Sequence, residues 1–193
     1  MSKYNTKEAE PLVSGSLIAA ELLMDEARDK AFGPPSITVT DCKFFSGKPQ
    51  AVDIDRDHDG KPDATGKITY SFFGNIDKID VTGKDGSKEY SIQFNRFLGV
   101  VNSASLDLKG DGTTDSTLYP KYGWFSSKVN GIAIDRNNDR STDAAITFNR
   151  GWFTGDIYRA TFDRNNDGKP ENYYDLKRHW FSGNLEHLEP KKE

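Results

Sequence analysis

Cysteine is almost absent from this chain, and histidine is scarce. The single cysteine, Cys42, has no partner for an internal disulfide and stands apart from every histidine, so we expect a small buried or half-buried side chain. The three histidines, His58, His179 and His187, form no catalytic or metal-binding motif, and a solvated position is expected for each. These absences argue against zinc sites and thiol chemistry.

Long apolar runs are also missing. No stretch reaches the roughly 18 apolar residues of a membrane-spanning helix, and residues 17–24 are interrupted by Glu21, which makes them a poor signal peptide. The formal net charge is −4 and the basic residues are scattered among acidic ones, so no nucleic-acid partner is expected. We expect an extracellular, cell-surface or periplasmic protein, and the sequence leaves a cytoplasmic one open.

Aromatic side chains, by contrast, are plentiful. They make up 12% of the chain although only 35% of its residues are hydrophobic, so a few large rings must supply much of the buried surface. This profile favours thin antiparallel β structure, and a length of 193 residues favours one domain.

Residues 16–32 carry a helical pattern. Apolar residues recur there at intervals of three and four, Glu21 and other charged residues take the opposite face, Ser16 can cap the start, and Gly33 ends the pattern. We therefore expect residues 1–35 to form a frayed tail and an amphipathic helix that packs on the sheet of a β-repeat domain, residues 36–193. A helix that binds a partner or a membrane surface is the alternative.

After residue 35 the chain repeats an aromatic pair. Successive pairs are separated by 28, 25, 27, 28 and 28 residues, and all three tryptophans occupy the first position of a pair. The pairs are Phe44-Phe45, Phe72-Phe73, Trp124-Phe125, Trp152-Phe153 and Trp180-Phe181, with Phe97-Leu98 as the odd member. A fixed step of this length marks a tandem repeat, and we expect five units of one β-hairpin each.

The segments that lead into the pairs alternate apolar and polar residues, as strands with one buried face do. Ile68, Tyr70 and Phe72, for example, point one way. The pattern predicts a mainly β fold, an antiparallel meander of about ten strands that forms a barrel or a strongly curved sheet with the helix against its apolar face. Residues 37–42 could add one more strand.

The same alternation predicts where the aromatic side chains lie. The first ring of each pair should be buried in equivalent places, and the second should either seal the rim of the core or be exposed to a sugar ring or a protein. The predicted buried rings are Phe72, Trp124, Trp152 and Trp180, and the second rings are Phe73, Phe125, Phe153 and Phe181.

Acidic turns alternate with the aromatic pairs. The first turn follows the pattern D-x-D-x-D-G-x-x-D, and the fifth follows it with Asn and Glu replacing two Asp. Oxygens at alternate positions can surround a hard cation, glycine allows the bend, and oxygen-only ligands favour Ca²⁺ over a transition metal. The candidate calcium ligands are Asp55, Asp57, Asp59, the carbonyl of Lys61 and Asp63 in the first turn, and Asp163, Asn165, Asp167, the carbonyl of Lys169 and Glu171 in the fifth.

This nine-residue pattern resembles the calcium-binding β-hairpin loops of FG-GAP repeats in integrin α-subunits, and more loosely the loops of EF-hands, dockerins and thrombospondin type-3 repeats. An EF-hand loop would place Glu at the twelfth position, where Gly66 and Tyr174 stand, so the hairpin version fits better. The likeness covers only the turns. It implies calcium-binding turns and not a propeller, because the four-stranded propeller blades are longer than these units.

The other three turns depart from the pattern. The fourth has Arg140 in place of glycine, the third has Lys109 at a ligand position, and the second, residues 80–89, keeps only part of the spacing. The candidate ligands in the fourth turn are Asp135, Asn137, Asp139 and Asp143. The alternative for every turn is an ion-free loop whose Asp and Asn side chains hydrogen-bond to the local backbone.

Taken together, these features predict a non-enzymatic calcium-binding protein that acts as a binding or adhesion module for a glycan or a protein. A secreted effector or toxin component is one alternative. A carbohydrate-active enzyme is another, although its catalytic carboxylates should break the repeat and the acidic residues here follow it.

Overall fold

The computed structural model describes residues 6–25, 33–42, 48–98, 100–123, 128–178 and 185–191. These residues form one α-helix followed by twelve β-strands. The elements are α1 (Thr6–Met24), β1 (Ser36–Cys42), β2 (Pro49–Asp55), β3 (Ala64–Tyr70), β4 (Ile76–Gly83), β5 (Lys88–Phe97), β6 (Val100–Asp107), β7 (Ser116–Tyr122), β8 (Val129–Asp135), β9 (Ala144–Arg150), β10 (Ile157–Asp163), β11 (Asn172–Arg178) and β12 (Leu185–Lys191).

The strands form one closed antiparallel barrel. Each strand pairs with the next along the chain, and β12 pairs with β1, where Ile37 lies opposite Leu188. The predicted mainly β meander is confirmed, and it closes as a barrel. The barrel has more strands than the repeat count predicted, because β1 precedes the first acidic turn and β12 follows the last aromatic pair. Residues 185–191 carry only two leucines among polar residues, so the pattern did not identify β12.

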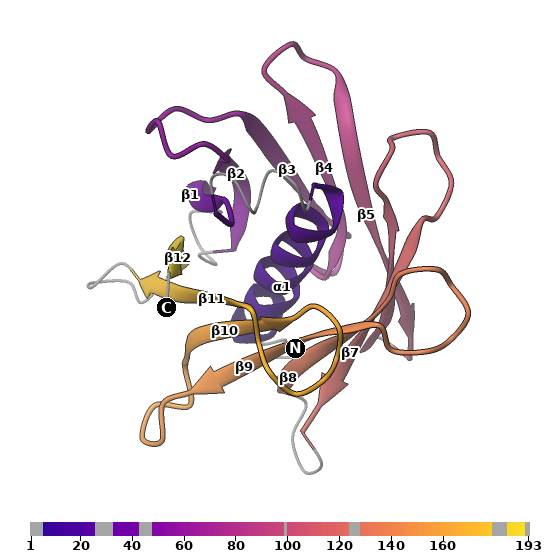
Figure 1. Cartoon of the computed structure of the whole chain (residues 1–193), viewed down its shortest axis with the longest axis vertical. Helices are drawn as coiled ribbons and strands as arrows, with labels where there is room; N and C mark the ends of the chain where they lie inside the picture. The colour runs from indigo at the N-terminus through magenta and orange to yellow at the C-terminus, as the bar shows by residue number, and fades with distance from the viewer. Residues whose placement is uncertain are drawn as a thin grey trace.

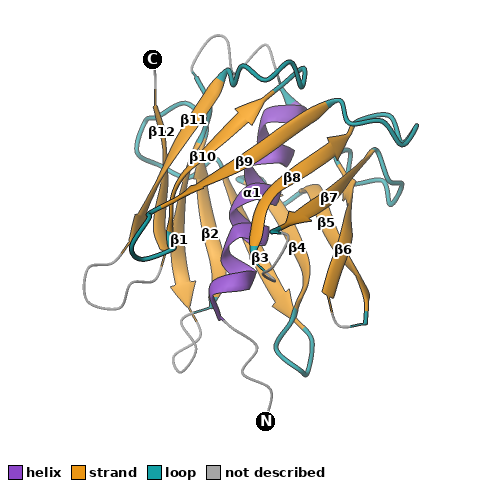
Figure 2. Cartoon of the chain, turned by 90° about the horizontal axis from the view of Figure 1, so that it is seen from below, coloured by secondary structure: helices purple, strands orange, loops and turns teal. Residues whose placement is uncertain are grey.

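The helix lies inside the barrel (Figures 1 and 2), and residues 11–22 are buried on every side. It begins at Thr6, well before the predicted start at Ser16, and the predicted residues 26–32 lie outside the described residues. Glu21, expected on a solvated face, is fully buried. The prediction that Glu21 is solvated was wrong, because a helix surrounded by strands has no solvated face. Within the described residues, no helix has the length and apolar character needed to cross a membrane.

Close packing between helix and wall depends on a small residue. A Cβ atom placed on Gly15 would lie 2.6 Å from Cδ1 of Ile132 and 2.7 Å from Cζ of Phe148. Ile132 is on β8 and Phe148 on β9, and both are buried. A side chain at this position would therefore have to displace core atoms, so the helix needs glycine where it approaches the barrel wall most closely.

The predicted burial of the first ring in each aromatic pair is wrong for both of the predicted rings that the structure describes. The side chain of Phe72 is 98% exposed and that of Trp152 is 94% exposed, while Trp124 and Trp180 lie outside the described residues. The strands end at Tyr70 and Arg150, so the apolar alternation stops before it reaches the pair. The core is built instead from aliphatic residues with a few other rings, among them Phe94, Phe148, Phe162, Tyr90 and Tyr174.

The second rings follow the exposed alternative. Phe73 and Phe153 are exposed, whereas Phe125 and Phe181 lie outside the described residues. Because the strands run up and down in turn, all connections of one kind fall at the same end of the barrel. The acidic turns lie at one end, where α1 terminates, and we call it the acidic end. The turns with the aromatic pairs lie at the other, where α1 begins, and we call it the aromatic end (Figure 2).

Candidate metal centre

The first acidic turn joins β2 to β3 and is held together by its own carboxylates. The carboxylate of Asp55 accepts backbone N–H bonds from His58 at 2.7 Å and Gly60 at 3.0 Å. The carboxylate of Asp63 accepts the N–H of Arg56 at 2.7 Å, and the N–H of Asp63 donates to the carbonyl of Ile54, also at 2.7 Å. These bonds satisfy backbone groups that the end of the strand pairing leaves open.

The third, fourth and fifth turns have a similar arrangement, except that the fifth residue donates where the fourth, His58, donates in the first turn. In each, the first Asp accepts the N–H groups of the fifth and sixth residues, and the ninth carboxylate accepts the N–H of the second. The first-position acceptors are Asp107, Asp135 and Asp163, and the ninth-position acceptors are Asp115, Asp143 and Glu171. The hydrogen bonds of the ion-free alternative are therefore present in four turns. They are compatible with a cation as well, because each carboxylate oxygen carries two lone pairs.

Two positions of the repeated turn have a left-handed backbone. The sixth position has φ of 81° at Gly60 and 85° at Gly168, as the glycine of the pattern predicts. Arg140 adopts φ of 73° at the same place, which a side chain disfavours. The fourth position is left-handed too, at His58 with φ of 62° and at Asn138 with 58°. The sequence pattern did not predict this second position, although asparagine or glycine stands there in three turns.

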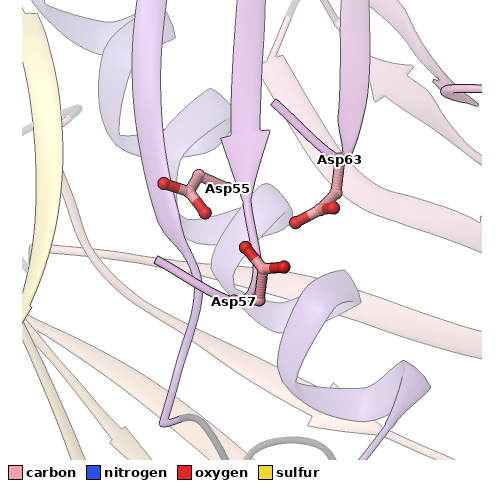
Figure 3. Close-up of side chains that lie close together, drawn as sticks. All are labelled: Asp55, Asp57 and Asp63. Carbon is pink, nitrogen blue, oxygen red and sulfur yellow. The ribbon is translucent and has the colours of Figure 1, made fainter. Parts of the chain in front are cut away.

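Three carboxylates of the first turn gather into a group that could hold a metal ion. One oxygen from each of Asp55, Asp57 and Asp63 can be chosen so that all lie within 4.8 Å of one another (Figure 3). Ca²⁺ binds its oxygens at about 2.3–2.6 Å, so ligands around one ion have this separation. Within the described residues, no other group of three or more acidic, histidine or cysteine side chains meets the same condition.

The other predicted ligands lie differently. Asp59 is outside the group and accepts the N–H of Lys61 at 2.8 Å. In the fifth turn Asp167 accepts the N–H of Lys169 at 2.8 Å, and the amide of Asn165 donates to Asp167 at 3.2 Å. The fourth turn has the same pair, since Asn137 donates to Asp139 at 3.0 Å. These side chains order their own loops, and only the first turn brings three acidic groups together.

A lysine from the second turn forms an ion pair with a carboxylate of the first turn. The Nζ of Lys84 lies 2.7 Å from a carboxylate oxygen of Asp63. Burial raises the pKa of Asp63, but the ammonium of Lys84 and the N–H of Arg56 outweigh it and hold the pKa below its ordinary value. Lys109 pairs with Asp115 in the same way within the third turn. Both lysines are internal counter-charges with which a cation must compete.

The second position of three turns is an arginine, and sequence analysis assigned it no role. Arg56 donates two hydrogen bonds of 2.9 Å to Glu21 on the helix, and Arg164 donates one of 2.9 Å to the carbonyl of Leu22. Arg136 donates to the carbonyl of Arg164. Arg56 and Arg164 connect their turns to the C-terminal part of α1, where the helix dipole favours positive charge, and Arg136 connects the fourth turn to the fifth. Their recurrence at one position of the repeat was the signal available in the sequence.

Glu21 is the centre of a buried polar network. Besides Arg56, it accepts the hydroxyl of Tyr90 at 2.9 Å, and Arg56 also pairs with Glu89 at 2.6 Å. Burial lowers the pKa of Arg56, but its hydrogen bonds to Glu21 and Glu89 raise it above the ordinary value. Arg56 is part of the first turn, so the conformation of the candidate metal site is coupled directly to the helix.

Comparison with known proteins gives little further guidance. No protein-family model matches the chain, and no curated protein matches it. Among solved structures, the chain is similar to a porin-like protein from Bacteroides uniformis, with 9% sequence identity and a TM-score of 0.32. The match covers 77% of this chain and 66% of that one, slightly less than two thirds of its length. A TM-score this low carries no conclusion about function.

Proposed function

We propose that the protein is a non-enzymatic binding module whose first acidic turn binds Ca²⁺. The observation that carries this proposal is the approach of Asp55, Asp57 and Asp63 to within 4.8 Å. The carbonyl of Lys61 and water would complete a shell of six to eight oxygens. Carboxylates brought this close repel one another, and a divalent cation relieves that repulsion.

The affinity should be modest. The site offers three carboxylates, and the Lys84 ammonium already neutralises part of their charge. A calcium site of this kind belongs to the range of extracellular modules, with a Kd of roughly 10⁻⁴ to 10⁻³ M. Such a site fills only where calcium is millimolar, so the proposal places the working protein outside the cytoplasm.

The role of the ion would be to fix the mouth of the barrel. Binding at the first turn holds Asp63 and the chain around Arg56, and Arg56 is bonded to Glu21 and Glu89. A ligand that binds only the native turn stabilises the fold by mass action, by about 2.7 kcal/mol at a concentration of one hundred times Kd. The fourth and fifth turns, whose carboxylates do not gather in this way, would bind calcium more weakly.

The partner surface of this module would be the aromatic end. The sequence suggested that Phe73 and Phe153 contact a glycan or a protein, and both rings are exposed. Calcium at the acidic end and contact at the aromatic end are separate functions of one rigid barrel, so each can be tested without the other.

The test is a calcium titration by calorimetry, together with thermal melts in calcium and in chelator. Asp57→Asn removes one ligand charge and should abolish the strongest binding step and most of the calcium-induced rise in Tm. Asp139→Asn removes an equally exposed carboxylate from the fourth turn, four residues after Asp135, and as the control it should change neither. Identical melts of the unaltered protein in calcium and chelator would refute the proposal.

A further inference from the structure

The exposed apolar surface of this protein is concentrated at the aromatic end. Nine large hydrophobic side chains are exposed among the described residues, and seven of them lie at or beside the turns of this end. These are Phe72, Phe73, Phe97, Leu98, Val100, Trp152 and Phe153. Of the other two, Tyr119 lies in the middle of β7 on the outer wall, and Tyr158 is the second residue of β10, close to the same end. Single exposed hydrophobic side chains are common on protein surfaces, but a concentration of them at one end indicates an interaction surface.

The turns that carry these rings are ordered by their own backbone. In the turn between β3 and β4, Ser71 N–H donates to Asn75 and Gly74 N–H donates to Ser71, both at 2.8 Å. The rings of Phe72 and Phe73 stand edge to face with their centroids 5.5 Å apart. The turn between β9 and β10 is closed similarly, by Gly155 N–H to Gly151 at 2.8 Å. The rings are therefore held outward by a rigid turn and contribute little to folding.

Positive charge accompanies the rings. Lys48 donates from Nζ to the carbonyl of Gly74, and a Cβ atom on Gly155 would lie 2.9 Å from Nζ of Lys128. Arg150 donates to the carbonyl of Gly155 at 2.8 Å. The described connection residues at this end, 48, 71–75, 98, 123, 128 and 151–156, contain two lysines, Lys48 and Lys128, and one acidic residue, Asp156. This end is thus apolar and basic, and the opposite end carries the clustered carboxylates.

We propose that the aromatic end, the partner surface of the proposed binding module, docks onto the surface of an anionic lipid bilayer in place of the glycan or protein that the sequence suggested. Turns from three different strand pairs project from one rim of a closed barrel, so they can enter a flat surface together. Their sequences differ, as Phe-Phe, Phe-Leu and Trp-Phe, and a fluid surface accepts such variety, whereas a shaped pocket would have to match each turn. Aromatic rings partition into the interfacial region, and lysines beside them attract anionic head groups.

The outer wall limits the depth of this contact. Beyond the turns the outward side chains are polar and exposed, as at Lys67, Thr69, Gln93 and Asn95. These groups would lose their hydration inside hydrocarbon, so docking would stop once the turns had entered. The proposal does not depend on calcium at the other end and can be tested in chelator.

The chain contains its own reporter for this contact. Trp152 lies in the turn between β9 and β10 at the aromatic end and is exposed, whereas Trp124 and Trp180 lie outside the described residues. Vesicles of phosphatidylcholine and phosphatidylglycerol in equal parts should therefore shift the tryptophan emission to shorter wavelength, and brominated lipids should quench it. Pure phosphatidylcholine vesicles should bind more weakly, and added salt should weaken the binding to anionic vesicles.

The decisive variants remove one exposed pair at a time. Phe72→Ser with Phe73→Ser, and Trp152→Ser with Phe153→Ser, should each reduce co-sedimentation with anionic vesicles by at least about tenfold, with unchanged Tm. Tyr119→Ser, halfway along β7 on the outer wall, is the control and should bind like the unaltered protein. Equal losses in the wall control, undiminished binding of the turn variants, or no binding of the unaltered protein to anionic vesicles would each overturn the proposal.

Discussion

At the acidic end of the barrel, side chains are tied to the backbone and to one another, whereas at the aromatic end the largest side chains contact almost nothing. The carboxylates of Asp55 and Asp63 each accept backbone N–H bonds, and Arg56 links their turn to the buried Glu21. Phe72 and Trp152 extend into solvent from turns of five and six residues. One set of turns therefore contributes to the stability of the fold, and the other is available to a partner.

The two ends of the helix show the same difference. At the acidic end, Glu21 is fully buried and bonded to Arg56 and Tyr90. At the aromatic end, Glu10 pairs with Arg178, and both side chains remain partly exposed. Removing one partner of a buried ion pair leaves an uncompensated charge, but removing one partner of a partly exposed pair costs far less.

The largest expected effect follows from this difference. Glu21→Ala should lower the free energy of unfolding by about 3 to 5 kcal/mol, because Arg56 and the hydroxyl of Tyr90 lose their buried partner. Glu10→Ala is the control at the other end of the helix and should cost less, about 1 to 2 kcal/mol, because Arg178 keeps some contact with water and its bond to the carbonyl of Ile157. Urea denaturation of both variants makes the comparison. Equal losses would mean that the buried network does not anchor the helix more firmly than the outer pair.

Two neighbouring rings on the β9 segment sharpen the comparison between core and turn. Phe148 is buried against the helix, and Trp152, four residues later, is exposed. Phe148→Ala should cost about 3 to 5 kcal/mol because it leaves a cavity. Trp152→Ala should change the free energy of unfolding by about 0.5 kcal/mol or less, as exposed substitutions do. A large loss for Trp152→Ala would show that the turn packs against the rest of the molecule.

These two rings also show how far the sequence predicts the fold. Alternation identified most of the strands, and the fixed step of the aromatic pairs identified the repeat, so the antiparallel meander could be predicted, while a closed barrel and a strongly curved sheet remained alternatives. The alternation continued on paper to Phe72 and Trp152, but the chain reverses at Ser71 and Gly151, where the N–H groups bond across the turn. Burial depends on where a strand ends, and a period of two does not reveal its own last residue.

The environment of the helix and of the metal centre could be predicted only in part, because both depend on contacts between residues far apart in the sequence. Glu21 looked solvated because the helical pattern assumes one wet face, and only closure of the barrel around the helix buries it. The pattern of the first turn predicted that Asp55, Asp57 and Asp63 could share an ion, which remains a prediction. The pairing of Lys84 with Asp63 joins residues 21 positions apart in different turns, and no local pattern encodes it.

Within the acidic end, the left-handed backbone of the fourth turn allows a prediction whose expected effect on stability is of intermediate size. Arg140 holds φ at 73°, where glycine stands in the other turns of the template. Arg140→Gly should raise the free energy of unfolding by about 1 kcal/mol through relief of this conformation, and it should tighten any calcium binding there by removing a positive charge. Gly168→Ala, at the equivalent position of the fifth turn, should destabilise by a similar amount. Thermal melts of both variants should move in opposite directions.

The smallest expected effect concerns the lysine that competes with the ion. Lys84 keeps the pKa of Asp63 below its ordinary value of 3.8, so the pair stabilises the ion-free protein above that value and loses its contribution as pH falls through the folded-state pKa. Lys84→Gln should therefore weaken the acid dependence of stability below about pH 4. At neutral pH it should tighten calcium binding by roughly two- to fivefold, because the cation no longer displaces an ammonium.

Lys88→Gln is the control for this variant, since Lys88 pairs with Asp107 of the third turn at 3.2 Å and does not contact the three-carboxylate group. It should leave the calcium affinity of the first turn unchanged. Calorimetric titration at neutral pH and urea melts between pH 3 and pH 5, roughly one unit either side of the ordinary carboxyl pKa, measure both effects. If Lys84→Gln weakened calcium binding instead, the lysine would be supporting the loop geometry, and its part in the site would be structural rather than competitive.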